Sequence, residues 1–82
     1  MNFTVYSRRL CPYCDKIKKI FEHISITKGF PVLIYELDTD FTSEDFITKF
    51  GEDATFPQVM VNNVSIGGSS KTVKYLMENR LI

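Results

Sequence analysis

The sequence has few of the features that mark membrane, secreted or nucleic-acid-binding proteins. Its longest apolar run, Phe30–Tyr35, is far shorter than the ~20 residues that cross a bilayer. Two cysteines are too few for a small extracellular scaffold, which usually has about two to four disulfides. Ten basic and ten acidic residues give a net charge of zero, so the positive surface of a nucleic-acid binder is missing. We therefore expect no membrane segment and no DNA or RNA partner.

Targeting signals, repeats and low-complexity tracts are also missing. Phe3–Tyr6 already has the pattern of a strand, and no basic-then-apolar secretion signal precedes it. The expected location is the reducing cytoplasm, where two closely spaced cysteines indicate redox or metal chemistry rather than a structural bridge. The 82 residues suit one small domain, over residues 1–82.

The first half of the chain predicts a strand, a helix and a second strand. Phe3–Ser7 alternates like a strand, and a helix is expected from Pro12 to a stop at Gly29. Its apolar stripe consists of Ile17, Ile20, Phe21 and Ile24. Val32–Leu37 is almost continuously apolar, which predicts a central strand covered on both faces. These segments predict a right-handed βαβ unit with parallel strands.

A short helix and a hairpin are expected next. Thr42 or Ser43 can cap a helix that ends at Gly51. Its inward side chains are expected to be Phe46, Ile47 and Phe50. Gln58–Val61 and Val64–Gly67 flank two asparagines, which tolerate the positive φ of a tight hairpin turn.

A third helix completes the predicted fold. Ser69 and Ser70 can cap it, and its apolar stripe is expected to include Val73, Leu76, Met77 and Leu81. The predicted order is β-α-β-α-β-β-α. A four-stranded mixed sheet covered by three helices, on both faces, buries these stripes.

The chemistry is concentrated in Cys11-Pro12-Tyr13-Cys14, at the junction of the first strand and helix. Pro12 suits the first helical position because it lacks the N–H that would be unpaired there. Cys11 is then the N-cap and Cys14 lies one turn in, on the same face, close to the spacing that a disulfide favours.

A thiolate is expected on Cys11 rather than on Cys14. The helix dipole, nearby N–H groups and the charges of Arg8 and Arg9 all favour the anion at the N-cap. A readily ionised Cys11 is also a good leaving group, which indicates a turnover catalyst. The alternatives are an inert bridge or a metal site. A zinc site lacks ligands, because His23 is the only histidine and belongs to the polar face of the first helix.

Three motifs together resemble the dithiol glutaredoxins of the Cys-Pro-Tyr-Cys type. They are the cysteine motif itself, Thr55-Phe56-Pro57 before the third strand, and Gly67-Gly68-Ser69-Ser70 opening the last helix. The resemblance covers essentially the whole chain. It implies a thioredoxin-like α/β fold and a monomer that reduces protein disulfides and glutathione mixed disulfides. Glutathione is then the electron-donating co-substrate, with no permanently bound cofactor and no metal.

The resemblance also implies residue roles. Cys11 attacks and becomes glutathionylated, and Cys14 resolves the intermediate. Arg8 matches the basic residue that meets a glutathione carboxylate, and Tyr13 matches the aromatic wall beside the sulfur. Pro57 matches a cis proline.

Two further segments match the glutathione-binding positions of the family. Thr55, Phe56 and Pro57 take the place where backbone groups pair with the cysteine of glutathione. Gly68, Ser69 and Ser70 match the turn that holds the γ-glutamyl carboxylate, and a helix N-terminus is a ready anion site. One position departs from the pattern. Lys71 stands where the family usually has an aspartate facing the γ-glutamyl amino group, so we expect weaker glutathione binding or a displaced γ-glutamyl end.

Two related functions are alternatives. A dimeric glutaredoxin that carries an iron–sulfur cluster through Cys11 and glutathione is disfavoured by the Pro-Tyr insert. A thioredoxin role, fed directly by a reductase, is disfavoured by the same insert and by the Gly-Gly-Ser-Ser turn. Ribonucleotide reductase is a family-typical client, with no surface in the sequence that identifies it.

Overall fold

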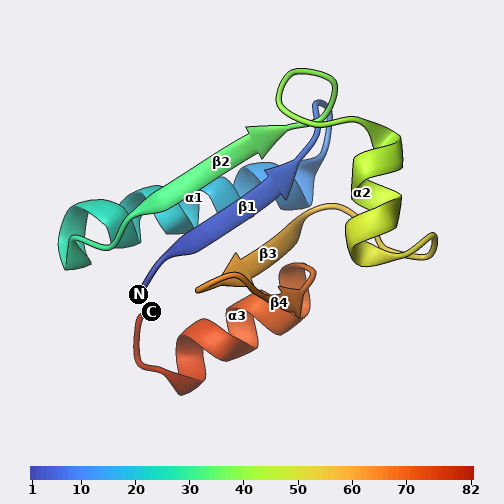
Figure 1. Ribbon diagram of the computed structural model, residues 1–82. Helices are drawn as coiled ribbons and strands as arrows, with labels where there is room; N and C mark the ends of the chain where they lie inside the picture. The colour runs from blue at the N-terminus through green and yellow to red at the C-terminus, as the bar shows by residue number, and fades with distance from the viewer.

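The computed structural model describes residues 1–82 and has the predicted element order. The elements are β1 (Phe3–Ser7), α1 (Pro12–Lys28), β2 (Val32–Glu36), α2 (Ser43–Phe50), β3 (Gln58–Val61), β4 (Val64–Gly67) and α3 (Ser69–Glu78), as drawn in Figure 1. The strands form one mixed sheet in the order β2-β1-β3-β4. β1 pairs in parallel with β2 and antiparallel with β3, which in turn pairs antiparallel with β4. None of the helices is long and apolar enough to span a membrane.

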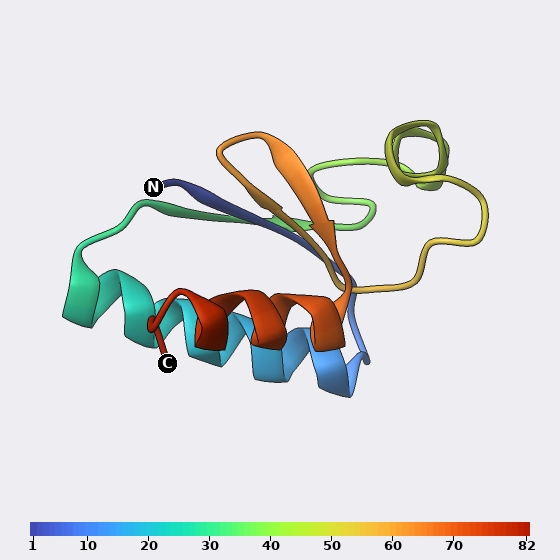
Figure 2. The same cartoon turned by 90° about the horizontal axis from the view of Figure 1, so that it is seen from below.

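The helices lie unequally on the two faces of the sheet. Figure 2 shows α1 and α3 side by side under one face, and α2 over one end of the other. The core lies between the sheet and the α1–α3 layer, because alternate strand residues point to opposite faces. It consists of Phe3, Val5, Ile17, Phe21, Ile24, Val59, Val61 and Leu76.

Both ends of α1 and the β3–β4 turn are as predicted. Cys11 is the N-cap, Pro12 occupies the first turn, and Gly29 ends the helix in the left-handed region at φ 72°. Asn62 and Asn63 join the hairpin with φ values of 50° and 68°. Asparagine tolerates this region better than most residues, so the turn forms with little strain.

The prediction that the second strand is central was wrong, because β2 is an edge strand that pairs only with β1. Val32 and Ile34 pack against the core, whereas Leu33, on the opposite face, is 55% exposed. The apolar run therefore reflects one buried face and one largely open face.

Two details of α2 and α3 also differ from the predictions. Ile47 was predicted to face inward but is 43% exposed. Phe46 is the one buried residue of α2, so the helix packs through that position and not through Ile47. In α3, Gly68 is the N-cap and no side chain caps the helix, so neither Ser69 nor Ser70 has the predicted capping role. Met77 is exposed, and the buried positions of α3 are Thr72 and Leu76.

Candidate active site

Cys11 and Cys14 lie at the start of α1, just beyond the carboxyl end of β1. Both are free thiols. The backbone N–H of Cys14 donates to Sγ of Cys11 over 3.2 Å, which is the capping interaction predicted for this position. Sγ of Cys11 also lies 3.9 Å from the carbonyl oxygen of Phe56. A donor N–H aimed at the sulfur stabilises a thiolate on Cys11.

The two thiols differ in accessibility and in proton affinity. Cys11 is 6% exposed, and Cys14 is completely buried. Burial, reinforced by a hydrogen bond with the Cys11 side chain, raises the pKa of the Cys14 thiol to about 12. Cys14 therefore keeps its proton at neutral pH. Cys11 is the thiol that solvent reaches, although it is more enclosed than the sequence suggested.

Arg8 is held at the site by an aromatic ring. Its guanidinium carbon lies 5.4 Å from the centre of the Phe56 ring, a cation–π contact. Phe56 also stacks on Phe46, with ring centres 4.1 Å apart and ring planes at 15° to each other. The Phe56 ring thus joins Arg8 to α2.

A groove of about 630 Å³ lies beside the cysteines, between the 53–58 segment and the start of α3. Six of the predicted binding residues line it, namely Tyr13, Thr55, Phe56, Gly68, Ser69 and Ser70. The Phe56–Pro57 peptide bond is cis, as expected, and Pro57 is fully buried. Arg8 and Pro57 are not among the lining residues.

The groove includes side chains that the sequence did not assign to it, among them Phe50, Asp53 and Gln58. Asp53 sits in an irregular segment between α2 and β3. No local pattern distinguishes it from the exposed Glu52 beside it, so only the folded chain brings it to the groove.

The N-terminus of α3 provides free donors on the groove wall. Its first turn has no acidic residue, and no side chain caps it. Backbone N–H groups there have no partner within the helix, so they can receive an anion.

Lys71 lies in the same wall, folded over Gly67. A Cβ atom on Gly67 would lie only 2.7 Å from Cδ of Lys71. Gly67 also has φ 109°, which favours glycine. Because Gly67 has no side chain, the Lys71 stem has room to lie against the turn. Lys71 adds positive charge to the groove.

A thioredoxin-like sheet with a Cys-X-X-Cys pair at the start of its first helix, in which one thiol is fully buried and the other keeps 6% of its surface exposed, defines a thiol–disulfide oxidoreductase. The chain belongs to the glutaredoxin family, whose family model matches residues 3–66.

Individual glutaredoxins are similar over almost the entire chain. Glutaredoxin-C6 of rice is 32% identical over 81 residues, which cover 95% of this chain and 69% of the rice protein. The structure of reduced Escherichia coli glutaredoxin is 28% identical, with a TM-score of 0.81 and 98% of each chain covered. A buckwheat glutaredoxin solved with glutathione has a TM-score of 0.73 at 24% identity, covering 96% of this chain and 71% of its own. That last likeness is one of fold.

Proposed function

We propose that this glutaredoxin reduces protein disulfides and glutathione mixed disulfides through the Cys11/Cys14 pair, with glutathione as electron donor. The observation that carries the proposal is the contact at the start of α1. There the Cys14 N–H donates to the Cys11 sulfur, while Cys14 itself is buried and protonated. This arrangement gives the two thiols different roles.

In the first step, the Cys11 thiolate attacks one sulfur of a substrate disulfide. A bond forms between Sγ of Cys11 and that sulfur, and the substrate's second sulfur leaves as a thiolate. The Cys14 N–H stabilises the anionic sulfur before attack. The same hydrogen bond makes Cys11 a good leaving group afterwards.

In the second step, Cys14 attacks Sγ of Cys11. The bond between Cys11 and the substrate sulfur that it attacked in the first step breaks, that sulfur takes the Cys14 proton and is released as a thiol, and a Cys11–Cys14 disulfide forms. One glutathione thiolate then opens this disulfide at Cys11 and leaves Cys11 glutathionylated. A second glutathione attacks the glutathione sulfur of that adduct, which gives glutathione disulfide and restores both thiols. When the substrate is itself a glutathione adduct, this last exchange alone completes the cycle.

The groove beside Cys11 is our proposed seat for glutathione. Its volume suits a small peptide, and the uncapped N-terminus of α3 offers N–H donors to the γ-glutamyl carboxylate. Tyr13 and Phe56 provide the apolar walls. The buckwheat relative of the same fold holds glutathione, and its assignment to this chain is our inference.

The test is an assay in which the protein reduces the mixed disulfide of glutathione and 2-mercaptoethanol. The rate is measured from the amount of glutathione disulfide that forms. Cys11→Ser should lose activity completely. Cys14→Ser should keep this activity but lose the reduction of an intramolecular protein disulfide by the dithiol route. A brown protein that is inactive in both assays would instead indicate an iron–sulfur carrier and would overturn the proposal.

A further inference from the structure

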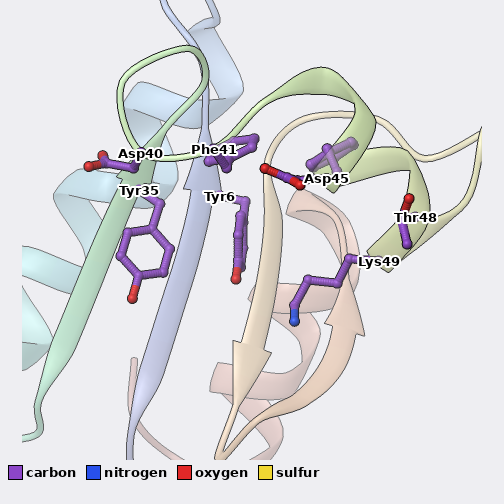
Figure 3. A pocket seen from close by; sticks show the side chains of 8 residues that line it. Tyr6, Tyr35, Asp40, Phe41, Asp45, Thr48 and Lys49 are labelled. Atoms are coloured by element: carbon purple, nitrogen blue, oxygen red, sulfur yellow. The ribbon is translucent and has the colours of Figure 1, made fainter.

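A second cavity of about 630 Å³ is lined by Tyr6 and Tyr35, which alternate along their strands with the core-facing Val5 and Ile34 and so face away from α1 and α3. Figure 3 shows it between the two parallel strands, the loop that follows β2, and α2. Tyr6 of β1 and Tyr35 of β2 lie side by side along it, with Phe41 above them in Figure 3. Phe46 also lines it. It is separate from the groove beside Cys11, and the two cavities share no lining residue.

The cavity has aromatic walls with a polar rim. The Tyr6 ring meets those of Tyr35 and Phe41 edge-on, with centres 5.4 and 5.1 Å apart. Burial, followed by the proximity of Tyr35, raises the pKa of Tyr6, so its phenol is neutral over the physiological range. The faces of such rings attract cations.

Two carboxylates stand at the rim with spare acceptor capacity. Oδ2 of Asp40 accepts from the N–H of Glu36 at 2.8 Å, and Oδ2 of Asp45 accepts from the N–H of Thr42 at 3.1 Å. The second oxygen of each has no hydrogen bond within the protein, and neither carboxylate has an ion-pair partner. Each can therefore accept from a ligand without losing its structural bond.

The surrounding chain is strongly acidic, although the whole protein is neutral. Residues 29–48 contain no lysine or arginine and five acidic residues, Glu36, Asp38, Asp40, Glu44 and Asp45. The one basic residue of the cavity is Lys49. Figure 3 shows its side chain extending away from Asp45, along the strands. Charge complementarity therefore favours a basic partner.

We propose that this cavity binds an arginine side chain of the proteins that the enzyme reduces. Arginine fits better than lysine because its planar guanidinium stacks on aromatic faces and donates to carboxylates in a fixed fork. The volume exceeds one side chain and admits the adjoining backbone of a partner segment. That the partner is a substrate rests on the proposed function.

The cavity adjoins the redox site through one layer of rings. Phe41 and Phe46, which line it, both stack on Phe56, and the Phe56 carbonyl lies beside the Cys11 sulfur. A protein bound with an arginine in the cavity therefore lies along the side of the molecule that carries Cys11. Binding there favours substrates that carry a basic residue near their disulfide.

Binding is tested by titrating the 15N-labelled protein with N-acetyl-arginine amide, and with N-acetyl-citrulline amide as its neutral counterpart. The arginine probe should shift amide signals around Tyr6, Tyr35 and Asp40, and the citrulline probe should bind at least about fivefold more weakly. Equal binding of the two probes, or shifts confined to other surfaces, would overturn the proposal.

Variants should change the affinity for the arginine probe in both directions. Asp40→Asn/Asp45→Asn keeps an acceptor for each structural hydrogen bond and removes both charges, so affinity for the arginine probe should fall about five- to tenfold. Asp38→Asn/Glu44→Gln removes two charges outside the cavity and should have a much smaller effect. Lys49→Met should increase affinity. Equal losses in the two double variants would show only a general effect of charge.

Kinetics distinguish this proposal from the proposed function. Peptides with a glutathionylated cysteine joined to arginine or citrulline by glycine–serine linkers of graded length are compared as substrates. The arginine series should reach a higher kcat/KM at one linker length, with the advantage lost in Asp40→Asn/Asp45→Asn. Equal rates would contradict the arginine site alone, whereas no turnover of any peptide would contradict the proposed function.

Discussion

At the scale of single residues, burial decides which thiol reacts first. Cys14 is fully enclosed with its pKa raised to about 12, whereas Cys11 is reachable and accepts an N–H. Iodoacetamide added to the reduced protein at neutral pH should therefore modify Cys11 well before Cys14, as located by mass spectrometry. Prior labelling of Cys14 would reverse the assigned roles.

The same shift makes stability depend on alkaline pH. In the folded state Cys14 keeps its proton to about pH 12. In the unfolded chain the same thiol has the ordinary pKa of 9.0 and loses its proton earlier. The folded state thus binds more protons between these values, and the free energy of unfolding should fall as pH rises above 9. Urea unfolding at several pH values measures this. Cys14→Ala should lack this part of the decline, and parallel curves for the two proteins would contradict the shift.

Lys71 places a positive charge in the wall of the groove. Its ammonium should repel the γ-glutamyl amino group, so Lys71→Asp should lower the KM for glutathione about fivefold, from a gain of order 1 kcal/mol at a partly exposed site. Lys74→Asp makes the same charge change one turn later on α3, outside the groove, and serves as the control. Unchanged kinetics in Lys71→Asp would refute the repulsion.

At the scale of elements, the β3–β4 turn offers a clean test of local backbone preference. Asn63 has φ 68°, where glycine is more favourable, whereas the Asn62 side chain also accepts the N–H of Asn2 at 2.8 Å. Asn63→Gly should raise the free energy of unfolding by about 0.5–1 kcal/mol. Asn62→Gly loses that hydrogen bond and should give no such gain. Urea denaturation of both variants decides, and equal effects would argue against the turn conformation.

Elements whose ends are set by neighbouring residues were predictable from the sequence. Pro12 and Gly29 delimit α1 through their own backbone preferences, and the paired asparagines specify the hairpin. The place of β2 was not predictable in this way, because an apolar run shows that a strand is buried but not how many strands flank it. The exposure of Ile47 was not predictable for a similar reason. The sequence shows that α2 has apolar residues, but only the packing of α2 through Phe46 leaves the adjacent Ile47 facing outward.

The site divides along the same line. The cysteine pair could be placed from its own residues, and the six groove residues lie in contiguous motifs that the resemblance to the glutaredoxins assigned to the site. Asp53 and the contact of Arg8 with Phe56 depend on how distant segments meet, and no spacing in the sequence encodes that meeting.

At the scale of the whole molecule, the two layers are unequal in cohesion. β1 is paired on both sides and covered by α1 and α3, whereas α2 lies over one end of the sheet and fully buries one residue, Phe46. Segments with few buried contacts open at lower free energy than the global transition. We therefore expect α2 to open without the rest of the sheet. Amide exchange under native conditions should show faster exchange in α2 than in β1 and β3.

Phe56 controls this opening, because its ring stacks on Phe46 and carries Arg8 on its exposed side. Phe56→Val should lower the opening free energy of α2 by about 1 kcal/mol, and the free energy of global unfolding with it. Phe30→Val makes the same substitution beside Phe3, at the other end of the core, and should lower the exchange free energies of β1 while leaving those of α2 unchanged. If Phe30→Val instead lowers α2 as much as β1, α2 unfolds only with the sheet, and the redox site rests on a single cooperative unit.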